Sequence, residues 1–181
     1  VNNLYQLQWM NQALNGKYEL GRNIDASATS AWNSNGSGGY YGFNPIGNST
    51  NKFNGTFDGL GFTISNLYIN RPSQNYVGLF GYTNNATIKN LGLKNVGITG
   101  SVYVGGLVGE NYGTISNSYA TTGSVSGTHT VGGLVGYNWY GTISNSYASG
   151  NVSAQDYLAG GLVGANRGRT IENSYATGNV T

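Results

Sequence analysis

The chain has 181 residues and a net charge of +2, and only 8% of its residues are charged, against roughly a quarter in ordinary soluble domains. Nucleic-acid binding is excluded as a main function, because phosphate recognition needs clustered lysine and arginine. Without cysteine there are no disulfides and no cysteine-based zinc sites. No run approaches the roughly 20 apolar residues of a membrane span, so membrane insertion is not expected.

The first residues predict a capping helix over residues 1–16. Its apolar side chains follow helical spacing: Leu4, Leu7, Met10 and Leu14. Asn2 or Asn3 is suited to the N-cap and Gly16 to the end of the helix. Such a helix would cover the open edge of the first stacked strands.

The region from 17 to 54 does not repeat. The segment YELGRNID (18–25) predicts a strand. Residues 26–54 are rich in serine, glycine and asparagine and predict a long loop excursion between early coils.

From residue 55 onward the sequence repeats every 27 or 28 residues. Three copies align closely, over residues 103–127, 130–153 and 158–180, and more divergent copies occupy 55–69 and 76–98. Each copy contains short β-type runs separated by glycine and asparagine, such as VGGLVG (131–136), TISNSYA (142–148) and NVS (151–153). Three short strands per repeat predict an all-β fold, a parallel β-solenoid whose coils stack about 4.8 Å apart. A propeller blade would need roughly 40 residues.

Five aligned hexapeptides (ISNLYI, IKNLGL, ISNSYA twice, and IENSYA) predict the register. The first position is expected to form one interior line: Ile64, Ile88, Ile115, Ile143 and Ile171. The third position is expected to form an internal asparagine ladder at a corner, because asparagine tolerates left-handed backbone and stacked amides bond to each other. Its members are Asn66, Asn90, Asn117, Asn145 and Asn173.

A corner at asparagine shifts the strand alternation by one residue. The fourth and sixth positions then face inward, and the fifth position forms an external ladder with exposed ring faces: Tyr68, Tyr119, Tyr147 and Tyr175. This ladder would either bind sugar rings or a host surface, or act as a scaffold through aromatic pairs along the stack. The scaffold role is favoured.

The pattern GGLVG…N.GTISNSYATG.V resembles the GLUG repeat. The N-terminal part, LYQLQWMNQALNGKYELGRNIDAS followed by FNGTFDGLGFTISNLYI, resembles large bacterial exoproteins of the filamentous haemagglutinin type. The resemblance covers essentially the whole chain. It implies a right-handed β-helix in a secreted or surface-anchored adhesin, often exported by two-partner secretion. GLUG repeats also occur as non-catalytic segments of surface metallopeptidases that cleave immunoglobulin A.

Catalytic chemistry has little support among the six acidic residues. β-Helical lyases and glycosidases need paired carboxylates, or aspartates with calcium. Only Asp25 and Asp58 are candidate neighbours on adjacent coils, and a strand end and a turn account for them. His129 lies in the SGTHT turn, without a second histidine or a cysteine to complete a metal site. We therefore expect no catalytic, cofactor-binding or metal site.

The sequence thus predicts a single β-solenoid segment over residues 1–181, with stacked coils from 55 to 181 that continue beyond residue 181 in the native protein. The expected function is that of a non-catalytic stalk or adhesive segment of an extracellular or cell-surface bacterial exoprotein, acting in adhesion, biofilm formation or host attachment. The expected partners are host-surface or matrix glycans or proteins, and copies of the chain joined end to end. The alternatives are a carbohydrate-active β-helix enzyme and a self-assembling structural filament.

Overall fold

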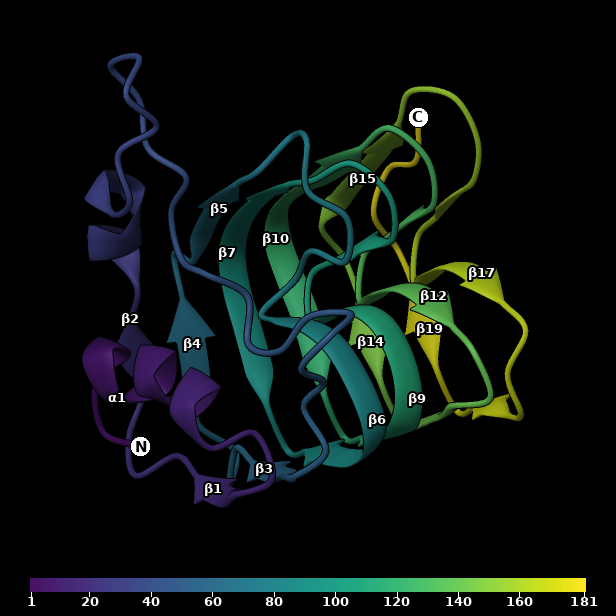
Figure 1. Ribbon diagram of the computed structural model, residues 1–181. Helices are drawn as coiled ribbons and strands as arrows, with labels where there is room; N and C mark the ends of the chain where they lie inside the picture. Colours follow the sequence, from purple (N-terminus) through teal and green to yellow (C-terminus); the bar gives the residue numbers. More distant parts are fainter.

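The strands of successive coils pair in parallel and build the sides of a β-solenoid (Figure 1). The structure is a computed structural model and describes residues 1–181. The first sheet follows the order β1 (Lys17–Glu19), β3 (Thr56–Asp58), β6 (Phe80–Lys89), β9 (Val108–Ser116), β12 (Val135–Asn138) and β17 (Val163–Asn166). Two shorter strands continue it, β13 (Thr142–Ser144) and β18 (Ile171–Glu172).

Two further sheets complete the coils. The second sheet follows the order β19 (Tyr175–Ala176), β14 (Tyr147–Ala148), β10 (Tyr119–Gly127), β7 (Gly92–Thr99), β4 (Thr63–Ser65) and β2 (Ile24–Asp25), with β5 (Tyr68–Asn70) and β15 (Asn151–Ala154) beside it. The third sheet is small and contains β16 (Ala159–Gly160), β11 (Val131–Gly132) and β8 (Val104–Gly105). The predicted parallel β-solenoid is confirmed.

The corners of a coil fall inside the predicted runs rather than between them. The run 131–136 spans β11 and the start of β12, and the run 142–148 spans β13 and β14. Val108 pairs with Val135 and Ile143 pairs with Ile171, which are 27 and 28 residues apart. One coil therefore uses one sequence repeat and passes through all three sheets.

The N-terminal helix is present but shorter than expected. Helix α1 spans Leu4–Trp9, and a 3-10 turn continues to Gln12. The Asn3 side chain accepts a hydrogen bond from the backbone N–H of Gln6 and caps the start. Ala13 leaves the helical region, with φ −147°, and its carbonyl accepts a hydrogen bond from the Tyr18 hydroxyl at 2.6 Å. The chain therefore turns towards β1 before it reaches Gly16.

Residues 17–54 form a first coil of their own. The predicted strand 18–25 divides into β1 and β2, which belong to different sheets. The excursion that follows contains a 3-10 helix (Ser27–Ala31) and three fully buried large apolar side chains: Phe43, Ile46 and Phe53. Parallel bridges join Ile46 to Phe80 and Phe53 to Thr83. The excursion thus packs into the apolar core instead of standing outside it.

The predicted isoleucine line is correct from Ile88 onward and wrong at Ile64. Ile88, Ile115, Ile143 and Ile171 are neighbours in register, but the residue before Ile88 in this line is Phe57. Ile64 lies in the second sheet, between Ile24 and Leu93. The corner from β3 to β4 holds four residues, 59–62, whereas the corner from β6 to β7 holds two, 90–91. The longer corner moves ISNLYI onto the next sheet.

The core is one apolar cluster that runs the length of the coils and includes Leu4, Leu7 and Met10 beneath α1. No helix here has the length and apolarity that a membrane crossing requires.

Candidate functional site

The predicted corner asparagines lie at the turn from the first to the second sheet, but their side chains do not form an internal ladder. Asn90, Asn117, Asn145 and Asn173 have φ values of 54°, 48°, 48° and 48°. The left-handed corner was therefore predicted correctly. The last three side chains are exposed, and only Asn90 forms a side-chain hydrogen bond, to Asp58. The corner turns these amides outward, so the prediction of an internal asparagine ladder at these positions was wrong.

Asn66 does not belong to this set at all. It occupies a different corner, between β4 and β5, with φ 58°. Its Nδ2 donates to Asp25 Oδ1 at 3.0 Å, and its Oδ1 accepts from Asn95 Nδ2 at 2.8 Å. The four-residue corner that displaces Ile64 displaces Asn66 as well.

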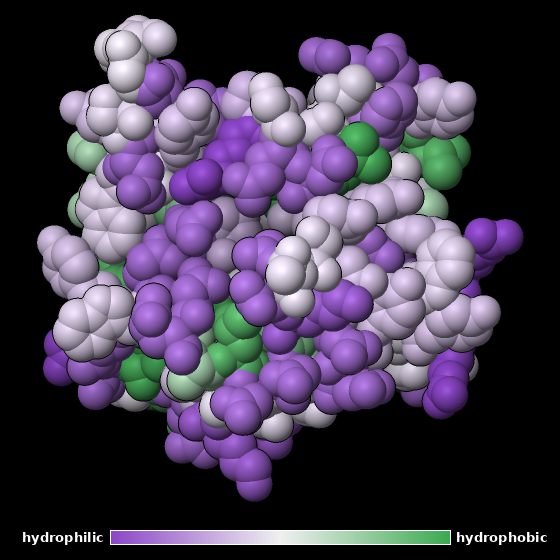
Figure 2. Space-filling model, in the orientation of Figure 1, coloured by the Kyte–Doolittle hydropathy of each residue, from purple (hydrophilic) through white to green (hydrophobic).

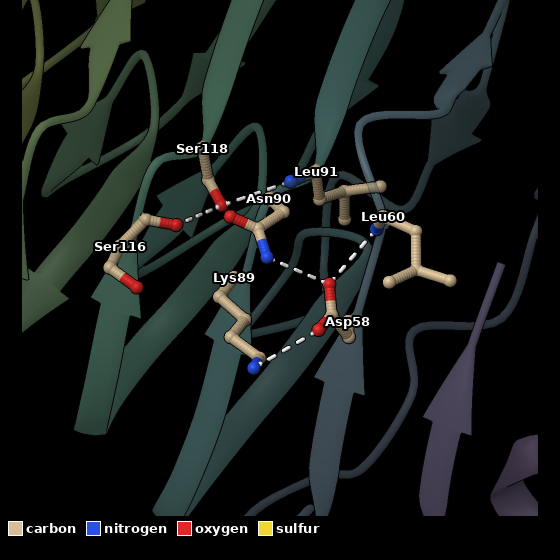
Figure 3. Close-up of polar contacts among 7 residues, drawn as sticks. All are labelled: Asp58, Leu60, Lys89, Asn90, Leu91, Ser116 and Ser118. Carbon is tan, nitrogen blue, oxygen red and sulfur yellow. Dashed lines mark hydrogen bonds and ion pairs between the residues drawn. The ribbon is translucent and has the colours of Figure 1, made fainter.

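A serine ladder lies on the inner side of the turn from the first to the second sheet. It is formed by Ser118, Ser146 and Ser174. The backbone N–H of Ser118 donates to Ser146 Oγ at 3.2 Å, and that of Ser146 donates to Ser174 Oγ at 3.1 Å. Each hydroxyl donates in turn to the carbonyl two residues earlier in its own coil. The ladder starts at Leu91, whose N–H reaches Ser118 Oγ (Figure 3). It satisfies backbone groups that the corner removes from the sheet.

An asparagine ladder does exist at Asn111, Asn138 and Asn166, and its first two members are buried. Asn111 Nδ2 donates to Asn138 Oδ1, and Asn138 Nδ2 donates to Asn166 Oδ1, both at 2.8 Å. Thr83 Oγ1 donates to Asn111 Oδ1 at the first rung. A Cβ at Gly141 would lie 2.2 Å from Asn111 Nδ2, so glycine is required beside the ladder. These asparagines recur at 27 and 28 residues, a signal that was visible in the repeat.

The tyrosine ladder contains Tyr119, Tyr147 and Tyr175. Their rings stack with centroid distances of 5.0 and 5.1 Å and interplanar angles of 12° and 3°. The side chains face outward as predicted, but Tyr119 and Tyr147 are half-buried because their ring faces cover each other. Exposed faces were therefore a wrong prediction for these two rings. Tyr68 pairs with Gly97 and lies outside the ladder.

The carboxylate of Asp58 is fully engaged (Figure 3). Lys89 Nζ lies 3.0 Å from Oδ2, while Asn90 Nδ2 and the N–H of Leu60 each donate to Oδ1 at 2.9 Å. Burial acts to raise the pKa of Asp58, but these hydrogen bonds and the lysine charge outweigh it and hold the pKa below its usual value. Asp58 lies in register with Glu19 rather than with Asp25, so the candidate Asp25–Asp58 pair does not form. Asp58 therefore stabilises the corner between β3 and β4.

A cluster of aromatic side chains covers part of the first sheet and was not predicted. This aromatic cluster consists of Tyr76, Tyr82, Tyr103, Tyr112, Tyr137, Trp139 and Tyr140, with neighbouring ring centroids 5.0 to 6.2 Å apart. Lys52 Nζ lies 4.6 Å from the Tyr82 ring centroid, and the Arg167 guanidinium lies 5.0 Å from that of Trp139. Figure 2 shows pale side chains of near-neutral hydropathy gathered over β9 and β12, among purple hydrophilic ones.

Glu110 lies inside the aromatic cluster, in register between Tyr82 and Tyr137. Its exposed fraction is 5%. Burial raises the pKa of Glu110 to about 6, and the Lys52 charge and hydrogen bonding by Tyr112 and Tyr82 only partly oppose this rise. The groups that act on it are thus a lysine and tyrosines, without a second carboxylate of the kind that glycoside hydrolysis requires.

Residues 100–126, 127–153 and 156–181 match the family described as "The GLUG motif". The chain carries three GLUG repeats. The first of them contains β8, β9 and all but the last residue of β10, and so forms one coil through all three sheets. The GLUG repeats also contain the serine ladder and the tyrosine ladder.

Two curated relatives each match part of the chain. Halomucin of Haloquadratum walsbyi is 48% identical over 99 residues, which cover 52% of this chain and 1% of halomucin. A protein of Evansella cellulosilytica named as a Gly-rich membrane protein is 41% identical over 75 residues, which cover 39% of this chain and 9% of that protein. The chain therefore spans a small fraction of either relative. The likeness to filamentous haemagglutinin-type exoproteins stays a prediction.

A solved structure shares the fold. The crystal structure of a candidate immunoglobulin A1 protease from Bacteroides ovatus superposes with a TM-score of 0.61 at 23% identity, covering 99% of this chain and 66% of that chain. At this identity the likeness shows a common fold and nothing about activity.

Proposed function

We propose that this chain is a non-catalytic stalk and adhesive segment of an extracellular or cell-surface protein. The observation that carries the proposal is the continuity of the side-chain ladders from coil to coil. In the serine ladder and the asparagine ladder each rung bonds directly to the next. No buried side-chain nitrogen or oxygen lacks a hydrogen-bond partner. A stack of this kind is stiff along its axis and offers a protease few open backbone segments.

The relatives support the extracellular part of the proposal. One is named a mucin and the other a membrane protein, and both names fit a cell-surface setting. The engaged Asp58 and the solitary Glu110 also favour a structural role over a carbohydrate-active enzyme, because neither site brings two available carboxylates together. Adhesion, biofilm formation and host attachment are the uses that such a segment would serve.

The partners that we propose are host-surface or matrix glycans or proteins. The tyrosine ladder supports a scaffold role, since Tyr119 and Tyr147 use their ring faces to pair with each other. An adhesive contact would then use other side chains of the solenoid surface. End-to-end association between copies also stays a prediction, which sedimentation velocity at increasing protein concentration would test.

Adhesion of coated beads tests the function directly. Beads that carry residues 1–181 should be retained under flow on surfaces coated with mucin glycoprotein, and the folded chain should resist proteinase K. Beads that carry albumin serve as one control, and beads that carry the Ile143→Asp variant serve as a second. Equal retention of all three bead types, or rapid digestion of the folded chain, would contradict the proposal.

A further inference from the structure

A hollow of about 300 Å³ opens on the first sheet beside the aromatic cluster. Successive coils line it: Asn85 and Thr87 come from β6, Tyr112 and Thr114 from β9, and Tyr140 precedes β13. Thr142 and Arg169 also line it, together with Ala86 and Gly113. The hollow thus combines aromatic rings, hydroxyls, an amide and one positive charge, the mixture by which a binding site orients a polar ligand.

The floor of the hollow is a row of threonines. Thr87, Thr114 and Thr142 are neighbours in register, one in each coil. Their hydroxyls form no hydrogen bond within the protein, unlike the serine hydroxyls of the interior ladder. A repeated hydroxyl, able both to donate and to accept, suits a ligand that itself carries hydroxyl groups at intervals.

The aromatic wall of the hollow is rigid. Tyr112 is stacked between Tyr82 and Trp139, with centroid distances of 5.5 and 6.2 Å. Tyr140 packs edge-on against Trp139 and remains 63% exposed. Tyr140 also has a φ of 58°, a conformation that a bulky residue rarely adopts. Strained backbone of this kind concentrates at ligand-contacting positions, and fixed aromatic rings bind at a low cost in conformational entropy.

The lining of the hollow carries one positive charge, that of Arg169. Arg169 is exposed, and the single ion pair of the chain joins Lys89 to Asp58 instead. No acidic residue lines the hollow. A guanidinium group binds a carboxylate through two parallel hydrogen bonds. The ligand that complements this hollow is therefore hydroxylated, has an apolar face and carries a carboxylate.

We propose that this hollow binds a carboxylated saccharide, a uronate or sialate unit of a glycan. The exposed ring of Tyr140 contacts the apolar face of the sugar ring, the edge of the Tyr112 ring borders the sugar, the threonine row bonds to its hydroxyls, and Arg169 pairs with its carboxylate. The site rests on the adhesive part of the proposed function, to which it gives a ligand class. The stalk role does not require it, so loss of sugar binding with intact protease resistance would overturn the site alone.

Calorimetric titration tests the site with defined sugars. The probes are 3′-sialyllactose and a galacturonate trisaccharide, with lactose and maltotriose as their neutral counterparts. At least one acidic probe should bind with a Kd of about 1 mM or lower, and its neutral counterpart should bind at least about tenfold more weakly. Binding of sialyllactose alone would indicate animal cell-surface glycans, and binding of galacturonate alone would indicate matrix polysaccharides.

Variants then assign the contacts. Arg169→Gln, Tyr140→Ala and Thr114→Val should each weaken binding of the acidic probe. The affinity should fall about tenfold for Arg169→Gln. Arg22→Gln and Tyr157→Ala change an exposed arginine and an exposed tyrosine outside the hollow and should leave binding unchanged. Arg169 and Thr114 are exposed, so their variants should keep the melting temperature of the unmodified chain. The proposal is overturned if neither acid binds, if neutral sugars bind equally, or if the control variants lose as much.

Discussion

At the scale of single residues, Glu110 occupies a position in β9 that neighbouring coils give to Tyr82 and Tyr137. Burial raises the pKa of its carboxyl to about 6, above the value of about 4.3 in an unfolded chain. Between these two values the folded state therefore holds more protons than the unfolded state. Linkage then requires the free energy of unfolding to fall as the pH rises through this window.

Replacing Glu110 with Gln should remove that pH dependence. We expect Glu110→Gln to be more stable than the unmodified chain at pH 7.5 by about 1 to 2 kcal/mol, because it no longer buries a charge. The two proteins should differ less at pH 5. Urea denaturation at both pH values measures this, with Glu172→Gln as the exposed control. If the two proteins differ in unfolding free energy by the same amount at both pH values, Glu110 does not titrate in this window.

The left-handed corner at Asn145 makes a second prediction. Asn145 has a φ of 48° and an exposed side chain without a hydrogen bond, so its contribution is that of its backbone. Asn145→Ala should destabilise the chain by about 1 kcal/mol, whereas Asn145→Gly should be nearly neutral. Thermal unfolding of both variants distinguishes the cases. An equal loss for both would instead indicate that the amide group itself stabilises the corner.

At the scale of elements, the serine ladder links the corners of successive coils. Ser146→Ala removes the acceptor of the Ser118 N–H, which leaves a buried donor unpaired. A loss of about 1 to 3 kcal/mol in the free energy of unfolding is expected. Ser144→Ala, which changes a half-buried serine two residues away, is the matched control and should cost much less. Denaturant titration gives both values, and equal costs would contradict the ladder.

In the tyrosine ladder, the stability cost of removing a ring should depend on how many rings it stacks on. Tyr147 stacks on two rings, and Tyr175 stacks on one. Each pair is worth about 0.5 to 1.5 kcal/mol beyond its buried area, so Tyr147→Ser should cost about twice as much as Tyr175→Ser. A thermal melt of each variant measures the ratio. If neither substitution changes the melting temperature, the tyrosine ladder has no scaffold role.

The sequence pattern predicted elements best where the repeat is regular. The line from Ile88 to Ile171 and the left-handed asparagine corners followed from spacing alone. Ile64 and Asn66 were misplaced because two additional residues in one corner shift the whole strand to the next sheet, and a hexapeptide comparison does not detect such a shift. The buried ladder at Asn111 and Asn138 was overlooked because asparagine serves both as a corner former and as a stacking amide.

The aromatic cluster lay beyond a pattern argument for a different reason. Glu110 lies between tyrosines in register, and Tyr76 and Tyr103 reach the same cluster from the turns before β6 and β8. No single repeat position is aromatic throughout. The rings meet only because stacking brings different positions of adjacent coils together, and the hollow beside them depends on the same three-dimensional arrangement.

At the scale of the whole molecule, the core is continuous, so damage in its middle should spread to both sides. Ile143 is fully buried between Ile115 and Ile171. Ile143→Asp would bury an unpaired carboxylate, at a cost of several kcal/mol, and should unfold the central coils. Ile171→Asp changes a partly buried residue of the last coil and should cost less. Melting curves compare the two variants, and equal melting temperatures would contradict a continuous core.

The coil period also sets how the segment responds to tension. Each coil of 27 or 28 residues adds only about 4.8 Å to the height of the stack. Pulled free, the same residues would extend to about 90 Å. A load along the axis that detaches one coil would therefore lengthen the tether nearly twentyfold for that coil, while the coils below remain folded. The solenoid would unfold one coil at a time under load, and each unfolding step would dissipate part of the energy of a sudden pull on whatever it anchors.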